Sequence, residues 1–328
     1  MNFSDKKTLN LVTHSSNFHA DDIFATSVLK IYFAYAYPKI KLSIQRSIDP
    51  KVIQAADIVY DIGKIYDTKK LRFDHHQTGG ADTRENGIRY AAFGLVWKHF
   101  GLEVCKFHTE KISGKKATSK QAAAQFSIVE KTLVSHIDGM DNGQLTYKEL
   151  YTDVVPLTFD RYFQLCKISA SAMYAGDIVK TNKAFDTEFF KLVETSIEIL
   201  KNILTYAFYK EQDESKAIKA YEKAVDKRLV IADRFYYFNF AKFPEPLVIV
   251  YPDARGGWAA KVVEKEGALY DARFYFPKEW AGLTDGDLEK VSGVSGAQFC
   301  HNARFLATAD TKKGVLELVH KAFVLAGI

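Results

Sequence analysis

The chain has 328 residues, of which 47% are hydrophobic and 26% charged, with a formal net charge of +5 at pH 7. This composition excludes a disordered or fibrous protein, and the length suffices for about two domains with buried cores. No run of 18 uncharged apolar residues occurs, and the start MNFSDKKTLN lacks an apolar segment. We therefore expect a cytoplasmic protein with no membrane partner. The widely spaced Cys105, Cys166 and Cys300 predict neither disulfides nor a thiolate metal site.

Short apolar runs alternate with amphipathic stretches in the first part of the chain. The expected strands cover 9–12, 41–46, 58–60 and 71–73. The expected helices cover 22–37, 50–56 and 89–100, and Gly101 is predicted to end the last of them. This alternation is typical of an α/β domain in which helices cover a parallel sheet. We assign it to residues 1–155.

The rest of the chain changes character twice. A lysine-rich exposed loop or ragged helix end is expected over 106–120, followed by a helix over 121–137. Residues 156–228 are rich in helix formers and predict a helical connector, interrupted at Gly176. Apolar runs at 229–240, 247–251, 258–263 and 272–276, with a final helix at 313–325, predict a smaller α+β domain over 229–328.

Histidine and aspartate residues recur where the predicted strands end. The candidates are His14, His19, Asp21, Asp61, Asp74, His75 and His76. The carboxyl ends of the strands in an open α/β sheet face one crevice, so these side chains should converge. Imidazole and carboxylate together suit Mn²⁺, Zn²⁺ or Fe²⁺, and this many ligands would hold two ions. Two such ions favour phosphoester hydrolysis.

Other polar residues are weaker candidates. A single histidine is more often a structural group than a ligand, and we assign no role to His99, His108, His136 or His320. The aspartates in DGMDNG at 138–143 follow a predicted helix. Asp138 and Asp141 are therefore either capping residues or further metal ligands.

Four motifs in order resemble a known family. The segment FDHHQ at 73–77 is similar to the signature of the DHH phosphoesterases. The segments THSSNFHAD at 13–21, DIGKIYD at 61–67 and DGMDNG at 138–143 are similar to the MYG branch of that superfamily, named for a melanocyte proliferating gene. The segment VSGVSGAQFCH at 291–301 also resembles this family. The resemblance spans nearly the whole chain.

The resemblance implies a Rossmann-like DHH domain joined to a smaller substrate-binding domain. It implies that His14 and His19 bind one metal, that Asp21 and His75 bind the other, and that Asp61 bridges the two. Asp141 matches the last carboxylate ligand best, and Asp138 is a nearby alternative. In catalysis, His76 would face the phosphate and Asp74 would orient the neighbouring imidazoles.

The resemblance also points to substrate-binding residues in the C-terminal part. Gly293, Gly296 and His301 lie in a segment that resembles a phosphate-contacting loop, in which glycines let backbone N–H groups approach an anion. Arg255 and Arg304 are further candidates for phosphate or base contacts.

These features predict a metal-dependent 3′→5′ exonuclease that acts on RNA or single-stranded oligonucleotides. From the family we expect two Mn²⁺ ions, with Mg²⁺, Zn²⁺ or Fe²⁺ as alternatives. A first alternative function is hydrolysis of a small substrate such as pyrophosphate, a cyclic dinucleotide or a nucleotide derivative. A second is a non-catalytic, metal-dependent binding protein. The choice between RNA and DNA and the oligomeric state, including a homodimer, remain open at this point.

Overall fold

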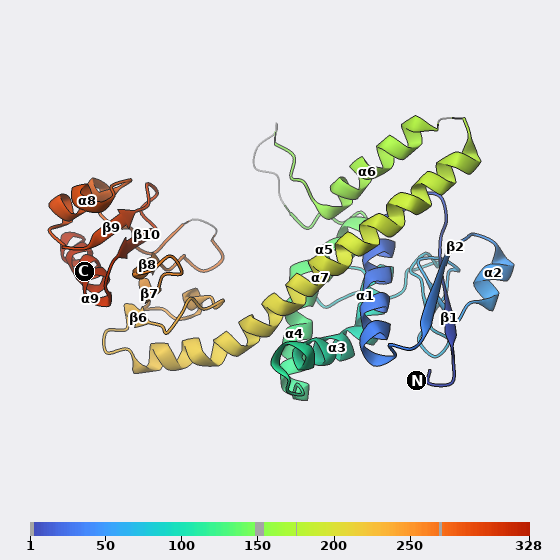
Figure 1. Cartoon of the computed structure of the whole chain (residues 1–328), viewed down its shortest axis with the longest axis horizontal. Coiled ribbons are helices and arrows are strands. Elements are labelled where there is room, and N and C mark those ends of the chain that lie inside the picture. The colour runs from blue at the N-terminus through green and yellow to red at the C-terminus, as the bar shows by residue number, and fades with distance from the viewer. Residues whose placement is uncertain (1–2, 148–153, 175, 269–270) are drawn as a thin grey trace. The chain divides into compact units, whose positions relative to one another are not determined.

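The computed structural model describes residues 3–147, 154–174, 176–268 and 271–328. It is an α/β protein with two mixed β-sheets (Figure 1). The chain divides into a first unit, Met1–Phe208, and a second unit, Tyr209–Ile328. The division falls within helix α7 (Ile178–Lys223). No described helix is both long and apolar enough to cross a membrane.

The sheet of the first unit is mostly parallel. Its strand order is β2 (Lys41–Arg46), β1 (Thr8–Thr13), β3 (Ile58–Tyr60), β5 (Arg72–Phe73) and β4 (Tyr66–Asp67). Only β4 runs antiparallel to its neighbour. Because β1, β3 and β5 run in the same direction, the residues that follow them meet at one edge of the sheet.

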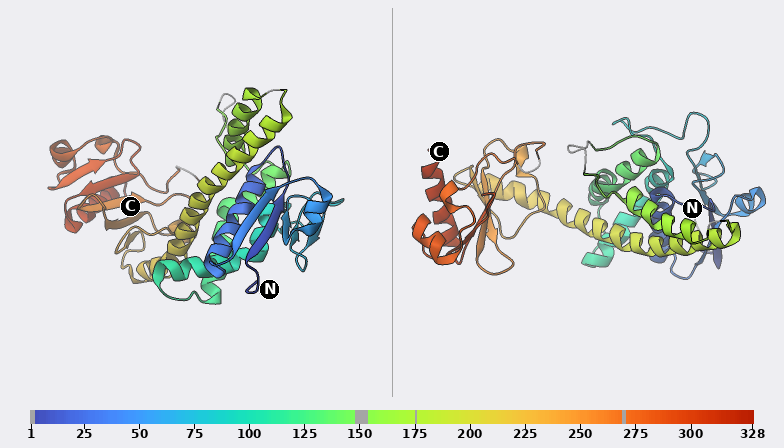
Figure 2. Two further views of the ribbon diagram at one scale, coloured as in Figure 1. Left: turned by 45° about the vertical axis from the view of Figure 1, so that its right-hand side comes forward. Right: turned by 90° about the horizontal axis from the view of Figure 1, so that it is seen from above.

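Helices cover both faces of this sheet (Figure 2). Leu9 and Leu11 of β1 pack into the main core with helices α1 (Ala20–Ala36) and α3 (Ala92–Ser113). Val12 points to the other face, where helix α2 (Pro50–Ala55) contributes to a smaller cluster. The alternation follows from the two-residue repeat of a strand, which sends successive side chains to opposite faces.

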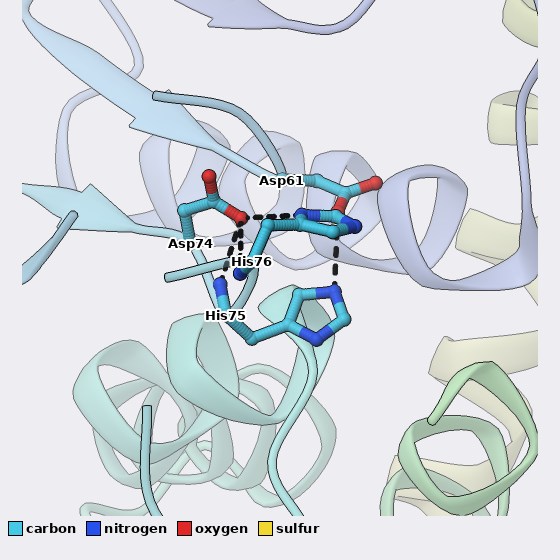
Figure 3. Close-up of side chains that lie close together, drawn as sticks. All are labelled: Asp61, Asp74, His75 and His76. Atoms are coloured by element: carbon cyan, nitrogen blue, oxygen red, sulfur yellow. Dashed lines mark hydrogen bonds and ion pairs between the residues drawn. The ribbon is translucent and has the colours of Figure 1, made fainter. Parts of the chain in front are cut away.

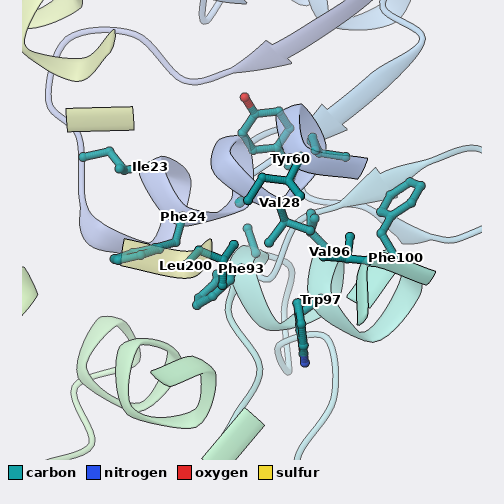
Figure 4. Packing of buried hydrophobic residues seen from close by; sticks show 14 of the residues in the cluster. Ile23, Phe24, Val28, Tyr60, Phe93, Val96, Trp97, Phe100 and Leu200 are labelled. Atoms are coloured by element: carbon teal, nitrogen blue, oxygen red, sulfur yellow. The ribbon is translucent and has the colours of Figure 1, made fainter. Parts of the chain in front are cut away.

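The main core is rich in aromatic residues (Figure 4). The Phe24 and Phe93 rings stack with their centroids 5.4 Å apart, and Leu200 of α7 joins the same cluster. Helix α3 does not end at Gly101 as predicted but continues to Ser113, so residues 106–113 form the end of the helix and the loop follows it. A Cβ on Gly101 would lie 2.5 Å from the Trp97 ring. The absence of a Cβ at this position therefore makes room for the Trp97 indole. A single glycine in a helix interior lowers helix stability but does not end the helix.

The helical middle of the chain contains one irregular turn. Helix α4 (Ser119–Val129) continues through a π-helical turn, η1 (Glu130–Val134), into helix α5 (Ser135–Asp141). Helix α6 (Phe159–Met173) and the 46-residue α7 follow. Gly176 lies between them with φ +89°, a backbone conformation that favours glycine.

The second unit is built on its own five-stranded sheet. The order is β6 (Leu229–Ile231), β7 (Val248–Pro252), β8 (Trp258–Val262), β10 (Leu306–Ala309) and β9 (Ala297–Cys300). Only the β6–β7 pair is parallel. Helices α8 (Asp285–Ser292) and α9 (Lys312–Leu325) contribute to the core on one face, and a second cluster that includes Ala217 of α7 covers the other.

Two predicted strands of the second unit were wrong in extent. The first ends at Ile231, and Phe240–Lys242 forms the 3₁₀ turn η2. Residues 272–276 form only an isolated bridge between Glu264 and Ala272, and Lys278–Trp280 forms the 3₁₀ turn η3. Ala272, Phe274 and Phe276 are all buried. The alternating sequence pattern therefore correctly indicates that every second side chain is buried. The segment itself does not pair with a neighbouring strand along its length.

Candidate metal centre

The histidine and aspartate motifs of the first unit line one cavity. His14 follows β1, Asp61 follows β3 and Asp74 follows β5, so all three stand at the same edge of the sheet. The cavity has a volume of about 690 Å³, and its lining includes these residues together with His19 and His76. Asp61 has φ +55°, a left-handed conformation that is uncommon for residues other than glycine. Such strain persists where the surrounding structure requires it.

His14 lies between two buried carboxylates. Its Nε2 atom is 3.2 Å from Asp22 Oδ2 and 3.2 Å from Asp61 Oδ2. Burial alone would lower the pKa of His14, but the hydrogen bonds to these two carboxylates raise it to about 11. The raised pKa of His14 reflects the negative charge of the two carboxylates beside it. The same negative charge would favour a bound metal cation.

His19 and Asp22 begin helix α1. His19 is the N-cap residue, and its backbone N–H donates to Asp22 Oδ1 at 2.9 Å in a capping box. The His19 and His14 rings lie 5.8 Å apart, and burial lowers the pKa of His19. A neutral imidazole with a free nitrogen is the form that binds metals.

Asp61 connects His14 to His75. His75 Nε2 is 3.4 Å from Asp61 Oδ1 and 3.3 Å from Asp141 Oδ2. Burial would raise the pKa of Asp61, but hydrogen bonds from His14 and His75 hold it well below its usual range. Asp61 is therefore ionised and has an imidazole at each carboxylate oxygen.

Asp74 organises the residues that follow it (Figure 3). Its Oδ1 accepts hydrogen bonds from the backbone N–H groups of His75 at 2.7 Å and His76 at 3.1 Å. The same oxygen lies 2.7 Å from His76 Nδ1. Burial would raise the pKa of Asp74, but the hydrogen bonds from His76 and from the Lys64 backbone lower it. Asp74 thus orients His76, whose side chain is 54% exposed.

The N-terminus of α3 holds two further carboxylates. Asp21 accepts hydrogen bonds from the backbone N–H groups of Ala92 at 3.1 Å and Phe93 at 2.6 Å. Asp138 accepts one from Gly94 at 2.9 Å and pairs with Arg84 at 2.6 Å. The unpaired N–H groups and the dipole of a helix N-terminus stabilise such anions.

The concentration of carboxylates raises several of their pKa values. Burial and the nearby charges of Asp61 and Asp141 raise the pKa of Asp21. Burial and the Asp61 charge raise the pKa of Asp141 to about 7. Burial raises the pKa of Asp138 to about 7 although Arg84 opposes it. Carboxylates this close together repel one another unless protons or cations lie between them.

The ligand atoms fall into three groups whose members lie within 4.8 Å of one another. These groups are His14, His19 and Asp61; then Asp21, His75 and Asp141; and finally Asp61, Asp74, His75 and His76. Asp138 belongs to none of them, because its carboxylate is turned to Arg84 and Gly94. Within the described residues, the buried atoms Asp61 Oδ1, His75 Nε2 and Asp22 Oδ2 approach one another's side chains or that of His14 at 3.2–3.4 Å but form no hydrogen bond of regular geometry. Buried imidazole nitrogens and carboxylate oxygens without regular hydrogen bonds fit divalent cations.

The candidate residues of the second unit do not form one cluster. Arg255 lies in the β7–β8 turn, where it pairs with Asp253 at 3.2 Å, and Gly296 precedes β9 at the same end of the sheet. Gly293 ends helix α8 with φ +64°. His301 and Arg304 lie in the β9–β10 turn at the opposite end of the sheet. There the His301 ring packs on Phe305 at 4.2 Å, and Arg304 donates to the Phe276 carbonyl at 3.3 Å.

Several residues near the centre were missed by sequence reasoning. Asp22 was not among the candidate ligands, although it begins α1 and also pairs with His14. Arg84, which pairs with Asp138 and Glu130, had no signal because it lies in an irregular segment. Asp160 and Lys167 of α6 also line the cavity. Their spacing along a helix face was the only signal that could have identified them.

The fold and the site define an α/β protein with a histidine–carboxylate centre of the kind that holds divalent cations. Residues 10–323 match the family model MYG1_exonuc, which is described as an uncharacterised protein family, UPF0160. The chain therefore belongs to this family.

Relatives of similar length occur in distant eukaryotes. The MYG1 protein of Dictyostelium discoideum is 27% identical over 334 residues, which cover 95% of this chain and 96% of the relative. The MYG1 protein of Saccharomyces cerevisiae is 26% identical over 338 residues, with 96% of each chain covered. The human relative, MYG1 exonuclease, is 23% identical over 325 residues, which cover 93% of this chain and 83% of the relative.

Proposed function

We propose that this chain is a metal-dependent phosphodiesterase of the DHH type, acting as a 3′→5′ exonuclease on RNA or single-stranded oligonucleotides. Support comes from the family and from relatives named as exonucleases. Further support comes from the mostly parallel sheet, whose strand ends meet at the cavity as in a Rossmann-like domain.

The position of Asp61 is the observation that carries the proposal. Oδ2 lies 3.2 Å from His14 Nε2, and Oδ1 lies 3.4 Å from His75 Nε2 without a hydrogen bond of regular geometry among the described residues. A carboxylate with both oxygens available between two imidazoles suits a bridge between two ions. Two divalent ions held there would lower the pKa of a shared water and stabilise charge on the attacking and leaving oxygens.

The remaining residues divide into two ligand sets in this proposal. His14 and His19 would complete one set, and Asp21, His75 and Asp141 the other, following the groups of neighbouring ligand atoms. The mixed imidazole and carboxylate donors accept several divalent cations. The family resemblance favours Mn²⁺ among them, with Mg²⁺, Zn²⁺ and Fe²⁺ as alternatives.

Neighbouring residues would orient the ligands and the substrate. Asp22 would hold His14, and Asp138 would hold the start of α3 beside Asp21. His76 is oriented by Asp74 and is partly exposed to the cavity, so it would donate a hydrogen bond to a phosphate oxygen. Hydrogen bonding to Asp74 raises the pKa of His76, which favours the donor form.

We assign the second unit to substrate binding in the same proposal. Gly296 and Arg255 would contact the substrate at one end of its sheet, with Gly293 at the neighbouring helix end. His301 and Arg304 would provide a separate contact at the other end. A strand of nucleic acid, unlike a small phosphate ester, is long enough to use both.

The proposal is tested by Mn²⁺-dependent degradation of a 5′-labelled single-stranded RNA 12-mer, beside the matching DNA and pyrophosphate. We expect a ladder that shortens from the 3′ end and disappears with Asp61→Ala. The matched control is Glu85→Ala, which removes an exposed carboxylate away from the cavity and should retain full activity. Release of phosphate from pyrophosphate alone would instead identify a small-substrate hydrolase. Mn²⁺ binding without turnover of any substrate would contradict a nuclease.

A further inference from the structure

Helix α6 forms a wall of the cavity that the proposed metal ligands do not use. Asp160, Gln164 and Lys167 line the cavity at positions i, i+4 and i+7 of this helix, a spacing that places side chains on one face. The amide of Gln164 and the ammonium of Lys167 differ chemically from the imidazoles and carboxylates at the strand ends. The cavity therefore has one wall of imidazoles and carboxylates, which suits cations, and a second wall on α6 that carries an amide and an ammonium.

Lys167 is the cation best placed to act within this cavity. Its Nζ donates a hydrogen bond to the Phe18 carbonyl at 2.6 Å, and its ammonium lies 5.6 Å from the Phe18 ring. An ammonium has three N–H donors, and no hydrogen bond to another described residue uses the remaining two. No carboxylate forms an ion pair with Lys167 in the described part of the chain. Burial lowers its pKa, as expected for a cation partly withdrawn from water.

The other residues of this wall are compatible with an anion. Gln164 is exposed to the cavity and offers an amide donor. Asp160 is the one acidic group on the face, and burial raises its pKa, which reduces the negative charge that an approaching anion would meet. Lys64 is the other lysine among the described residues that line the cavity, but it is exposed to solvent.

We propose that Lys167 and Gln164 bind a phosphate group of the substrate in the cavity that the histidine–aspartate centre lines. The inference rests on the proposed function, because it assigns these residues to the scissile phosphate of the same reaction. A partly buried cation with unused donors has a natural partner in a phosphate oxygen, and such charge-assisted hydrogen bonds are the stronger kind. Lys167 would at the same time keep its bond to Phe18, next to His19.

The test measures binding of inorganic phosphate by calorimetry in the presence of saturating Mn²⁺, which needs no turnover. Lys167→Met keeps most of the length of the side chain but removes its charge, and it should weaken phosphate binding roughly ten- to hundred-fold. Lys167→Arg should retain most of the affinity. The matched control, Arg161→Met, removes an exposed cation of the same helix that does not line the cavity and should change nothing.

Two further readouts separate substrate binding from a purely structural role. Mn²⁺ affinity should stay within about three-fold of the wild type in Lys167→Met, and KM for the oligonucleotide should rise more than kcat falls. Unchanged phosphate affinity in a folded Lys167→Met variant would overturn the inference. A loss of Mn²⁺ affinity that accounts for the whole effect would also overturn it, because Lys167 would then act only through Phe18.

A second variant keeps the inference testable if Lys167→Met does not fold. Gln164→Glu adds a negative charge at an exposed position of the same wall and should weaken phosphate binding at least ten-fold. Unchanged phosphate affinity in this variant would refute the role of α6. Because phosphate binding is measured without catalysis, this result is independent of whether the wild-type protein degrades RNA.

Discussion

Gly94 shows how closely single residues are packed around the carboxylates of the centre. A Cβ at this position would lie 1.8 Å from Asp138 Oδ2 and 2.6 Å from Arg84 Nη2. Gly94→Ala must therefore displace a buried ion pair, and we expect it to lower the free energy of unfolding by roughly 2–4 kcal/mol. Urea denaturation measures this change.

The matched control for this prediction is another helical glycine. Gly286 in α8 has nothing within 4 Å of its Cβ position. Gly286→Ala should be neutral or stabilise by up to about 1 kcal/mol, because alanine has the better helix propensity. Equal effects of the two substitutions would show that the space beside Gly94 is not restricted by Asp138.

His108 predicts a pH dependence of stability that is separate from the metal centre. It is buried between the Tyr35 hydroxyl at 3.2 Å and the Thr205 hydroxyl at 3.0 Å, and burial lowers its pKa from 6.5 to about 4. Between these two pKa values the unfolded chain binds more protons than the folded one. The free energy of unfolding should therefore fall as the pH falls from 6.5 towards 4.

We expect this effect to be roughly 1–2 kcal/mol, after allowing for partial access of water to the ring. Urea denaturation of wild type and His108→Gln at pH 7.5 and pH 5 measures it. The wild type should lose more stability than the variant on acidification, because glutamine does not titrate. Identical losses would mean that His108 takes up its proton equally in both states.

The π-helical turn η1 is an irregular element that contacts residues next to the candidate metal centre. Its first residue, Glu130, pairs with Arg84 and accepts a hydrogen bond from Ser135 at 3.1 Å. Arg84 in turn stacks on Tyr90 at 3.8 Å and holds Asp138. Such turns recur at functional sites, and this one connects α4 to the helix that ends at Asp141.

Glu130→Ala should therefore weaken both folding and metal binding. Removing one partner of a buried ion pair leaves Arg84 partly unpaired, and we expect a loss of roughly 1–3 kcal/mol in the free energy of unfolding. Mn²⁺ affinity, measured by calorimetry, should fall as α5 becomes less constrained. Lys131→Ala removes an exposed charge from the same turn and is the control. A variant with full Mn²⁺ affinity would exclude the turn from supporting the centre.

At the scale of the whole molecule, each unit has a core of its own. The main cluster of the first unit and the clusters of the second share no residue. Among the described residues, all the side-chain groups that could hold a metal lie in the first unit. A ligand that binds only the folded first unit should stabilise that unit alone.

Differential scanning calorimetry tests this prediction. Mn²⁺ at about 100 times its Kd should stabilise the first unit by about 2.7 kcal/mol and raise the temperature of one transition. The transition of the second unit should not move, and Asp61→Asn should abolish the shift. A single transition that moves as a whole would show that the shared helix α7 couples the units into one cooperative fold.

Much of the local structure was predictable from the sequence because apolar periodicity reports burial. The expected strands at 41–46 and 58–60 coincide with β2 and β3, and the final helix was placed within one residue. The same rule failed at residues 272–276, where side chains alternate between buried and partly exposed without a pairing strand. Periodicity detects which side chains are buried, but it contains no information about hydrogen-bonded neighbours.

The sequence by itself placed the candidate histidines and aspartates at strand ends, and parallel strands bring such positions to one edge of a sheet. Only the tertiary structure decided which carboxylates meet the histidines. Asp138 and Asp141 are three residues apart, yet one faces Arg84 and the other faces His75. The same holds for Lys167, which reaches the cavity from a helix distant in sequence. Such choices depend on the rotation and packing of whole helices, and these are set by contacts between residues far apart in the chain.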